Sequence, residues 1–191
     1  MSIRETVQGE TSVSETEIKK QVRPLYDETE IASRVEELAK EIGRTFEGDF
    51  MIVGVLKGCF VFVADLIRQF NRNGMPLEVE FIRLSSYGRD KESSGDVKLL
   101  SDLPEDIAGK QVLLVDDIVD TGLSLDYAVE HILKKGASQV KTCVLLDKPS
   151  RRANDFKADF IGFSIDDVFV VGYGIDYAGQ YRSLPYIGIV D

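Results

Sequence analysis

A cluster of acids and hydroxyls lies near the middle of the chain, and its spacing suits chemistry on a phosphorylated sugar. Asp116 and Asp117 come first, and Asp120-Thr121-Gly122-Leu123-Ser124 follows after two apolar residues. The second group offers backbone N–H groups, two hydroxyls and a glycine that lets the backbone approach a ligand, which suits a phosphate monoester. The acid pair would repel that phosphate. It suits sugar hydroxyls or Mg²⁺, which proteins usually hold with one or two carboxylates plus phosphate oxygens.

An ordinary structural interpretation explains the same residues. Asp120 could cap a helix, and Asp116 and Asp117 could be solvated acids at the end of a strand. The cluster alone does not separate these two interpretations, so the neighbouring segments have to decide between them.

The flanking segments predict a strand before the cluster and a helix after it. Val112–Val115 is a short apolar run, typical of a strand buried on both faces. The helix ends near Gly136, and its apolar positions are Leu125, Ala128, Val129, Ile132 and Leu133. Because ligands bind at the carboxyl ends of parallel strands, the cluster lies where a site is expected.

Basic residues follow two other predicted strands. Phe50–Leu56 is a buried strand followed by Lys57-Gly58, which suits an anion but is also the composition of a plain turn with a solvated lysine. Gln139–Leu146 is another strand, and Lys148 follows it beside Pro149, which stiffens the turn. That segment either points over the sheet or is an ordinary basic surface loop.

Three further features bear on function. Ser85–Asp96 is long and polar, and it is either disordered or a functional lid, with Tyr87 favouring a lid. Asp176 and Arg182 lie in a Tyr/Gly-rich segment that either packs plainly or closes over a charged ligand. The only histidine, His131, falls on the polar side of its helix, so we expect it to be solvated and not catalytic, which excludes His-based triads.

Length and charge limit the classes of protein. The chain has 191 residues, which favours one domain at residues 22–191 after a flexible Ser/Thr/Glu-rich arm at residues 1–21. We expect a cytoplasmic protein without a membrane partner, because no apolar run reaches the length of a membrane span or forms a signal peptide. The formal charge of −10 argues against nucleic acid as a partner.

Strands alternate with helices, which predicts an α/β fold with a parallel, doubly wound sheet. A helix is expected from about Phe60 to Arg72, and an earlier one after a capping box that begins at Asp27. The remaining expected strands are Leu77–Leu84, Val97–Leu100, Phe160–Phe163, Val168–Val171 and Tyr186–Val190. We expect the first helix and the C-terminal strands to form a smaller flanking element. A P-loop and a dinucleotide fold are excluded because GxxxxGK[ST] and GxGxxG are absent.

Five segments together resemble a known family. LLVDDIVDTGLSL (113–125) is similar to the phosphoribosyl-pyrophosphate motif of type I phosphoribosyltransferases. With GVLKGCFVFVADLIR (54–68), RLSSYG (83–88), LLDKPSRR (145–152) and FVVGYGIDYAGQYRSLPYIG (169–188), the chain resembles the hypoxanthine(-guanine) phosphoribosyltransferases. The resemblance covers roughly residues 22–190 in matching order. Asp116 stands where many of these proteins have Glu.

The resemblance implies the type I phosphoribosyltransferase fold, with helices flanking the sheet and a small hood made by the N- and C-terminal segments. It also implies purine salvage, in which 5-phosphoribosyl moves from phosphoribosyl pyrophosphate to N9 of hypoxanthine or guanine. The products would be IMP or GMP and pyrophosphate, and the cofactor Mg²⁺. A homodimer or homotetramer is usual in the family, as is a cis peptide before the lysine, here Leu56-Lys57.

The resemblance further implies a role for each site residue. The phosphoribosyl group would be bound by Asp116, Asp117, Asp120, Thr121, Gly122, Leu123 and Ser124. Asp120 would also act as the general base or proton relay at purine N7. The purine would contact Lys148, Phe169 and Val170, and pyrophosphate would contact Lys57, Gly58 and Arg182. Ser86 and Tyr87 would belong to the lid, and Mg²⁺ would be held by Asp116, Asp117 and Asp176.

Two alternatives come from other classes. A non-catalytic regulator that senses nucleotide or phosphoribosyl pyrophosphate would be expected to lose the base or the lid, yet Asp120, Lys148 and Tyr87 are all present. A phospho-acceptor receiver domain also pairs Asp-Asp with a later Lys-Pro. Its acids follow the first strand, whereas these follow at least two others.

Overall fold

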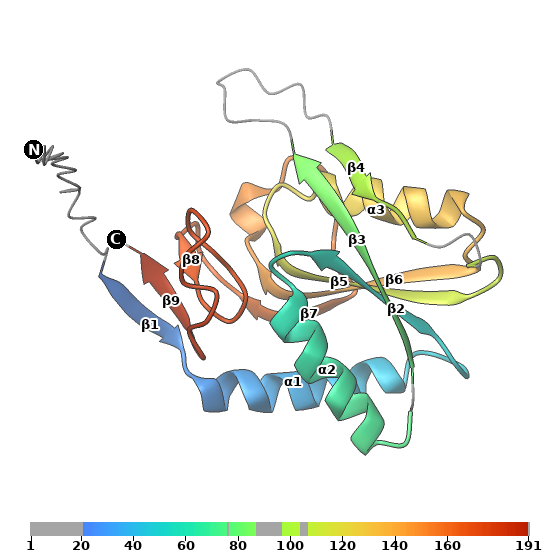
Figure 1. Ribbon diagram of the computed structural model, residues 1–191, viewed down its shortest axis with the longest axis horizontal. Coiled ribbons are helices and arrows are strands. Elements are labelled where there is room, and N and C mark those ends of the chain that lie inside the picture. The colour runs from blue at the N-terminus through green and yellow to red at the C-terminus, as the bar shows by residue number, and fades with distance from the viewer. Residues whose placement is uncertain (1–20, 76, 87–96, 104–106, 191) are drawn as a thin grey trace, which may run out of the picture.

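The computed structural model describes residues 21–75, 77–86, 97–103 and 107–190, and its main element is a six-stranded sheet (Figure 1). The sheet order is β4-β3-β2-β5-β6-β7. These strands are β2 (Met51–Leu56), β3 (Glu78–Ser86), β4 (Val97–Ser101), β5 (Gln111–Val119), β6 (Gln139–Asp147) and β7 (Phe160–Ser164). All neighbours pair in parallel except β4, which is an antiparallel edge strand. The predicted parallel sheet is thus confirmed, with one reversed edge.

Helices cover both faces of this sheet, because the central strands carry apolar side chains on both faces. Leu113 and Val115 of β5 pack into one core cluster with α1 (Glu28–Gly43) and α2 (Phe60–Arg72). Their neighbours Val112 and Leu114 pack into a second cluster with α3 (Leu123–Lys134) on the opposite face. A strand buried on both faces is therefore apolar throughout, as its sequence predicted.

The position expected for the first helix was wrong. Helix α1 begins at the predicted capping box, in which the Asp27 and Glu30 side chains accept each other's backbone N–H at 2.8 Å. It then lies beside α2 on the main sheet, because its apolar stripe is fully buried there. Arg34 fixes it to the sheet edge by donating to the carbonyls of Ile161 and Gly162 in β7.

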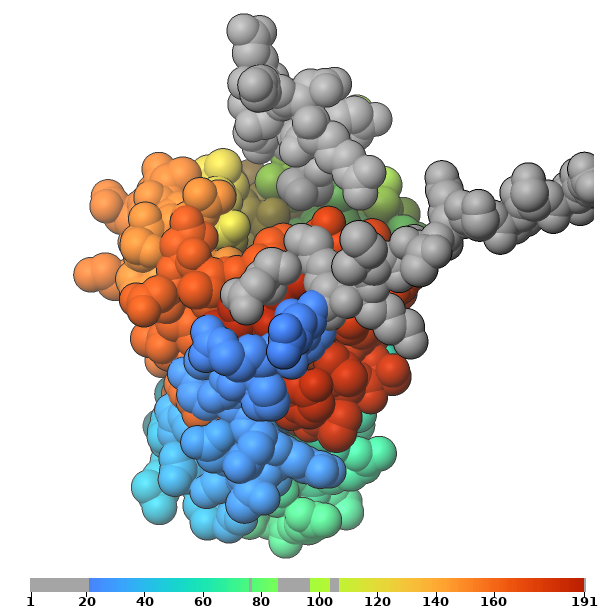
Figure 2. Space-filling view, turned by 90° about the vertical axis from the view of Figure 1, so that its left-hand side faces the viewer, coloured from blue at the N-terminus to red at the C-terminus, as the bar shows by residue number. Residues whose placement is uncertain are grey.

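A second, smaller sheet joins distant parts of the chain. Its order is β1-β9-β8, with β1 (Val22–Tyr26), β9 (Ile187–Val190) and β8 (Val170–Val171), all antiparallel. Figure 2 shows β1 in blue against the red C-terminal segment, above α1. This sheet confirms the expected hood from N- and C-terminal segments. The sequence did not predict β1 as a strand, and only two residues of the expected 168–171 strand pair in the sheet.

The expected arm at residues 1–21 and the expected lid at residues 85–96 lie largely outside the described residues, and so does Tyr87. His131 lies on the polar side of its helix as expected and is partly exposed, but it also has a partner that the sequence did not predict. Its Nε2 lies 2.7 Å from Asp102 Oδ1, and Lys135 Nζ lies 2.9 Å from the other carboxylate oxygen. Asp102 reaches α3 because it follows the edge strand β4. Within the described ranges, the helices are all too short or too polar to cross a bilayer.

Candidate active site

The parallel strands bring the predicted site residues together at their carboxyl ends. Strands β2, β5 and β6 are neighbours that run in the same direction. Lys57 directly follows β2, Lys148 directly follows β6, and the acid pair lies near the end of β5 between them. The acids lie within β5 rather than in the loop that the sequence predicted. The reason is that β5 stays paired with β6 as far as Val119, which lies opposite Asp147, so Asp116 and Asp117 are part of the paired strand.

Asp116 and Asp117 form a pair of adjacent carboxyl groups, the first buried and the second partly exposed. Asp116 is 8% exposed, and its Oδ1 accepts the backbone N–H of Asp117 at 2.9 Å. Burial, reinforced by the neighbouring acid, raises the pKa of Asp116 well above its usual range, and burial also raises the pKa of Asp117. In the described part of the chain, the salt bridges include none with either acid. The two carboxyl groups therefore offer oxygen ligands to a cation, which would neutralise their negative charge.

This donor set fits a hard divalent cation. Mg²⁺ prefers carboxylate oxygens and usually shares them with ligand phosphates. Over the described ranges, no three His, Cys, Asp or Glu side chains come together as a complete protein cage. Asp176, the third expected ligand, instead pairs with Arg182 at 2.6 Å and accepts the backbone N–H of Gly179. Any such ion would therefore take further ligands from the substrate.

The Lys57-Gly58 turn lies directly against the acid pair. A Cβ atom on Gly58 would lie 2.7 Å from Asp117 Oδ1 and still closer to the other carboxylate atoms, so only glycine fits. The peptide bond Leu56-Lys57 is cis, as the resemblance predicted. The charge of Arg182 also acts on Asp117, where it lowers the pKa against the effect of burial. The structure thus brings Gly58, Asp117 and Arg182 together from three distant segments.

The loop at residues 120–124 does not form an Asp-capped helix start. Gly122 stands at the N-cap of α3 with φ of 86°, a left-handed conformation that glycine adopts without steric cost. Asp120 is free to point elsewhere, and its Oδ1 accepts a hydrogen bond from Arg151 Nε at 3.0 Å. The Thr121 hydroxyl accepts the N–H of Leu123 at 3.4 Å. The capping interpretation of Asp120 is therefore wrong, and the ligand interpretation stays open.

Lys148 and Phe169 differ sharply in exposure. Lys148 is 8% exposed, its N–H donates to Val119 O at 3.0 Å, and its Nζ lies 3.9 Å from Asp167. The segment that leads to β8 starts from the same strand end, since Ile165 N–H donates to Asp147 O at 2.8 Å. Phe169 follows with 52% of its surface exposed and its ring edge-on to Tyr177 at 5.3 Å. Val170, the third expected purine contact, is buried in β8.

The sequence reasoning did not single out two arginines of this site. Arg151 binds the Asp120 carboxylate, and Arg152 donates to the Asp120 carbonyl and pairs with the Asp147 carboxylate. A signal was present, because Arg151 follows Lys148 by three positions, one turn of the short helix η1 (Pro149–Arg151). Ser86 ends β3 at the same edge of the sheet.

Comparison with known proteins agrees with this arrangement. A family model described as the phosphoribosyl transferase domain matches residues 21–178. The hypoxanthine-guanine phosphoribosyltransferase of Aquifex aeolicus is 48% identical over 174 residues, which are 90% of this chain and 96% of that protein. The hypoxanthine phosphoribosyltransferase of Escherichia coli K12 is 46% identical, over 91% of this chain and 97% of that protein.

A solved structure extends the likeness to three dimensions. The crystal structure of a hypoxanthine-guanine phosphoribosyltransferase from Bacillus anthracis superposes with a TM-score of 0.83 at 44% identity, and the match covers 90% of this chain and 100% of that one. The family match spans most of the chain, and the relatives are of nearly equal length. This chain therefore belongs to the phosphoribosyltransferase family.

Proposed function

We propose that this chain is a purine salvage enzyme that transfers 5-phosphoribosyl from phosphoribosyl pyrophosphate to N9 of hypoxanthine or guanine. The products are IMP or GMP and pyrophosphate. The observation that carries this proposal is that the carboxyl ends of adjacent strands bring together a buried lysine, a buried acid with its partly exposed neighbour, and a glycine-led helix start. The relatives named above, at 46–48% identity, are hypoxanthine or hypoxanthine-guanine phosphoribosyltransferases, which supports the same substrates.

The phosphoribosyl group is held by the end of β5 and the start of α3. The residues from Asp120 to Ser124 cradle its 5′-phosphate with backbone N–H groups of a helix N-terminus. Asp116 and Asp117 face the ribose hydroxyls. Lys57, Gly58 and Arg182 bind the pyrophosphate, whose charge grows as its bond to C1′ breaks.

The purine is held by the ends of β6 and β8. Lys148 donates to the 6-oxo group, which favours oxopurines over adenine because adenine offers an amine at that position. Phe169 stacks on the ring with its exposed face, and the backbone of Val170 meets the base edge. As N9 bonds to C1′, a carboxylate oxygen of Asp120 accepts the proton at N7, and Arg151 orients that carboxylate.

Asp116 and Asp117 would hold Mg²⁺ together with substrate oxygens, and Asp176 would hold a second ion. When bound, Mg²⁺ neutralises the charge that develops on the leaving pyrophosphate. Residues 85–96, with Ser86 and Tyr87, would exclude water from the ribosyl cation. We further propose one domain at residues 22–191, a cytoplasmic location, and a homodimer or homotetramer.

The test is a spectrophotometric assay with phosphoribosyl pyrophosphate, with and without Mg²⁺, and hypoxanthine, guanine, xanthine or adenine in turn. We expect turnover with an oxopurine that depends on Mg²⁺. The absence of turnover with every base, alongside measurable binding of phosphoribosyl pyrophosphate, would replace the enzyme by a regulator that only senses this ligand.

A further inference from the structure

The segment that carries Asp176 and Arg182 contains three non-glycine residues with positive φ, Tyr173, Ala178 and Tyr181, and of these three Tyr173 is the buried one. Gly172, Tyr173 and Gly174 all have positive φ, with values of 98°, 49° and 101°. Glycine adopts this region without cost, whereas a bulky residue with positive φ is an outlier that its surroundings must hold in place. Tyr173 therefore needs a specific partner.

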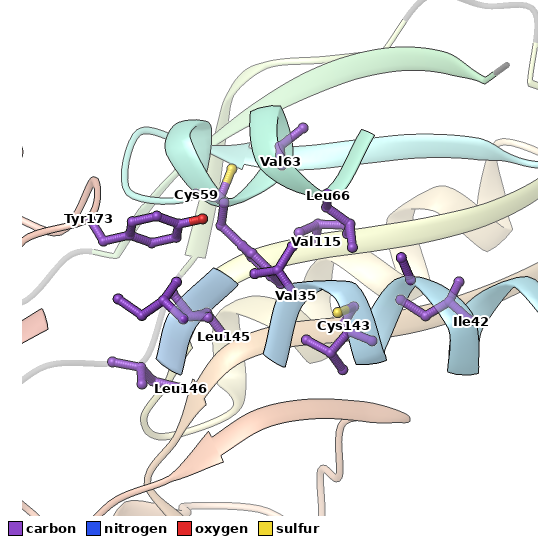
Figure 3. Packing of buried hydrophobic residues seen from close by; sticks show 14 of the residues in the cluster. Val35, Ile42, Cys59, Val63, Leu66, Val115, Cys143, Leu145, Leu146 and Tyr173 are labelled. Atoms are coloured by element: carbon purple, nitrogen blue, oxygen red, sulfur yellow. The ribbon is translucent and has the colours of Figure 1, made fainter. Parts of the chain in front are cut away.

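That partner is Asp65 of α2. The Tyr173 hydroxyl donates to Asp65 Oδ2 at 2.6 Å, and the ring is only 7% exposed. Figure 3 shows the ring reaching from the C-terminal segment toward α2, near Cys59. Burial, together with the Asp65 carboxylate, raises the pKa of Tyr173, so the phenol stays a donor over the whole working pH range. The other oxygen of Asp65 pairs with the exposed Arg68 at 2.6 Å.

Backbone hydrogen bonds of Tyr173 and Gly174 also anchor the segment that carries Arg182. Tyr173 N–H donates to Leu184 O at 2.9 Å, and Gly174 N–H donates to Arg182 O at 3.0 Å. The Arg182 guanidinium in turn donates to Gly174 O at 2.6 Å. Gly174 lies so close to the Gly58 carbonyl that a side chain would not fit between them. The position of Tyr173 thus sets where Arg182 lies relative to the Lys57-Gly58 turn.

We infer that Tyr173 and Asp65 are positioning residues for the pyrophosphate half of phosphoribosyl pyrophosphate. Their hydrogen bond joins α2, which starts from the Lys57-Gly58 turn, to the segment that carries Arg182. Neither residue is among those assigned above to contact the substrate, so each would act through Arg182 and the Lys57-Gly58 turn. The inference rests on the proposed function, because it takes Arg182 and Lys57-Gly58 as the pyrophosphate site.

The decisive variant is Tyr173→Phe, which removes one hydroxyl and keeps the buried ring. We expect the KM for phosphoribosyl pyrophosphate to rise by roughly tenfold, the effect of one lost hydrogen bond to a charged acceptor. The KM for hypoxanthine and the melting temperature should change little. Asp65→Ala should behave in the same way, and the double variant should be no worse than either single one.

Two matched variants separate positioning from general stability. Asp65→Asn keeps an oxygen that accepts from Tyr173, so it should restore the affinity that Asp65→Ala loses. Arg68→Ala removes only the exposed ion pair and should leave both KM values within about twofold of the wild-type values. A parallel rise of both KM values with a lower melting temperature in Tyr173→Phe would overturn the inference, because that is the pattern of a merely structural residue.

A further variant distinguishes failure of this inference from failure of the site assignment. Arg182→Ala should raise the KM for phosphoribosyl pyrophosphate more than Tyr173→Phe does. If Arg182→Ala weakens binding and neither Tyr173→Phe nor Asp65→Ala does, the positioning role is wrong and the pyrophosphate site stands. If Arg182→Ala leaves this KM unchanged, the pyrophosphate assignment itself is wrong, and the positioning role with it.

Discussion

Replacing Gly58 by alanine tests the close approach between the Lys57-Gly58 turn and the acid pair. The new methyl group would lie 2.7 Å from Asp117 Oδ1 and closer to the rest of that carboxylate. Relaxed contacts to carbon lie at about 3.5 Å, and the nearer carboxylate oxygen, Oδ2, sets the displacement, so the carboxylate has to retreat by more than about 1 Å. Overpacking of this kind costs about 1–3 kcal/mol of stability.

The kinetic effect should be larger than the effect on stability. A displacement of about 1 Å in a positioning group can lower catalysis by about 10²-fold. We therefore expect Gly58→Ala to lose about that factor in kcat/KM for phosphoribosyl pyrophosphate, measured by the spectrophotometric assay. Gly43→Ala is the matched control, since its methyl group would meet only the flexible end of the Met75 side chain at 2.8 Å. Gly43 is the last residue of α1 and is not one of the site residues. That variant should keep wild-type kinetics.

A double-mutant cycle tests whether Gly58→Ala weakens the enzyme by displacing Asp117. If the methyl group acts by displacing Asp117, then Gly58→Ala should add almost nothing in an Asp117→Ala background, with affinity for phosphoribosyl pyrophosphate read by calorimetry. Additive losses would refute the displacement argument, as would a Gly58→Ala enzyme with wild-type kcat/KM.

Three further predictions follow from the described contacts. Asp120→Asn should keep the fold and phosphate binding but lower turnover by roughly 10²-fold or more, and wild-type turnover would exclude a general-base role. Lys148→Ala should weaken oxopurine binding by about 1–3 kcal/mol in calorimetric titrations, and unchanged affinity would count against the contact to the 6-oxo group. Burial opposes ionisation of Asp102, but hydrogen bonds from His131 and Lys135 outweigh it and lower the pKa of this carboxyl to about 2. The pKa of Asp102 in the folded state lies below the unfolded value of about 3.9. The ionised carboxylate therefore stabilises the fold above about pH 3.9, and this contribution to stability is lost as the pH falls toward 2. Urea unfolding should therefore show Asp102→Asn less stable than wild type at pH 7, with the difference shrinking between about pH 4 and pH 2.

Local sequence patterns predicted most elements of this fold because those elements depend on periodicity. The capping box at Asp27 and the helix from Phe60 to Arg72 are confirmed, as are the buried strands around residues 51–56 and 139–147. The strand β1 was missed because its pairing with β9 lies far away in the sequence. The length of β5 was underestimated because acids rarely continue a strand unless it is paired with a neighbouring strand, as β5 is with β6.

The candidate site was predicted as a set of residues but not as a set of contacts. The motifs placed Lys57, the acid pair and Lys148 after strands that the structure shows to be neighbours. Arg151 could have been placed near Lys148 from its spacing, but its bond to Asp120 could not. The partner of Tyr173 could not be predicted either, because Asp65 comes from a segment whose spacing along the chain says nothing about its distance in space. Side chains that join separate elements are decided by tertiary packing.

The antiparallel pairing of Val22 with Val190 has a consequence for the order of folding. This contact closes almost the whole chain into a loop, and non-local pairings form late because the closure entropy comes before the gain from contacts. The central sheet forms from nearer neighbours, so the hood should complete last and also open first under native conditions. Amide hydrogens of β1, β8 and β9 should then exchange through small openings that leave β5 and β6 protected. Because Phe169 and Val170 belong to this late-forming part, the purine pocket would reach its final shape only in the last step of folding.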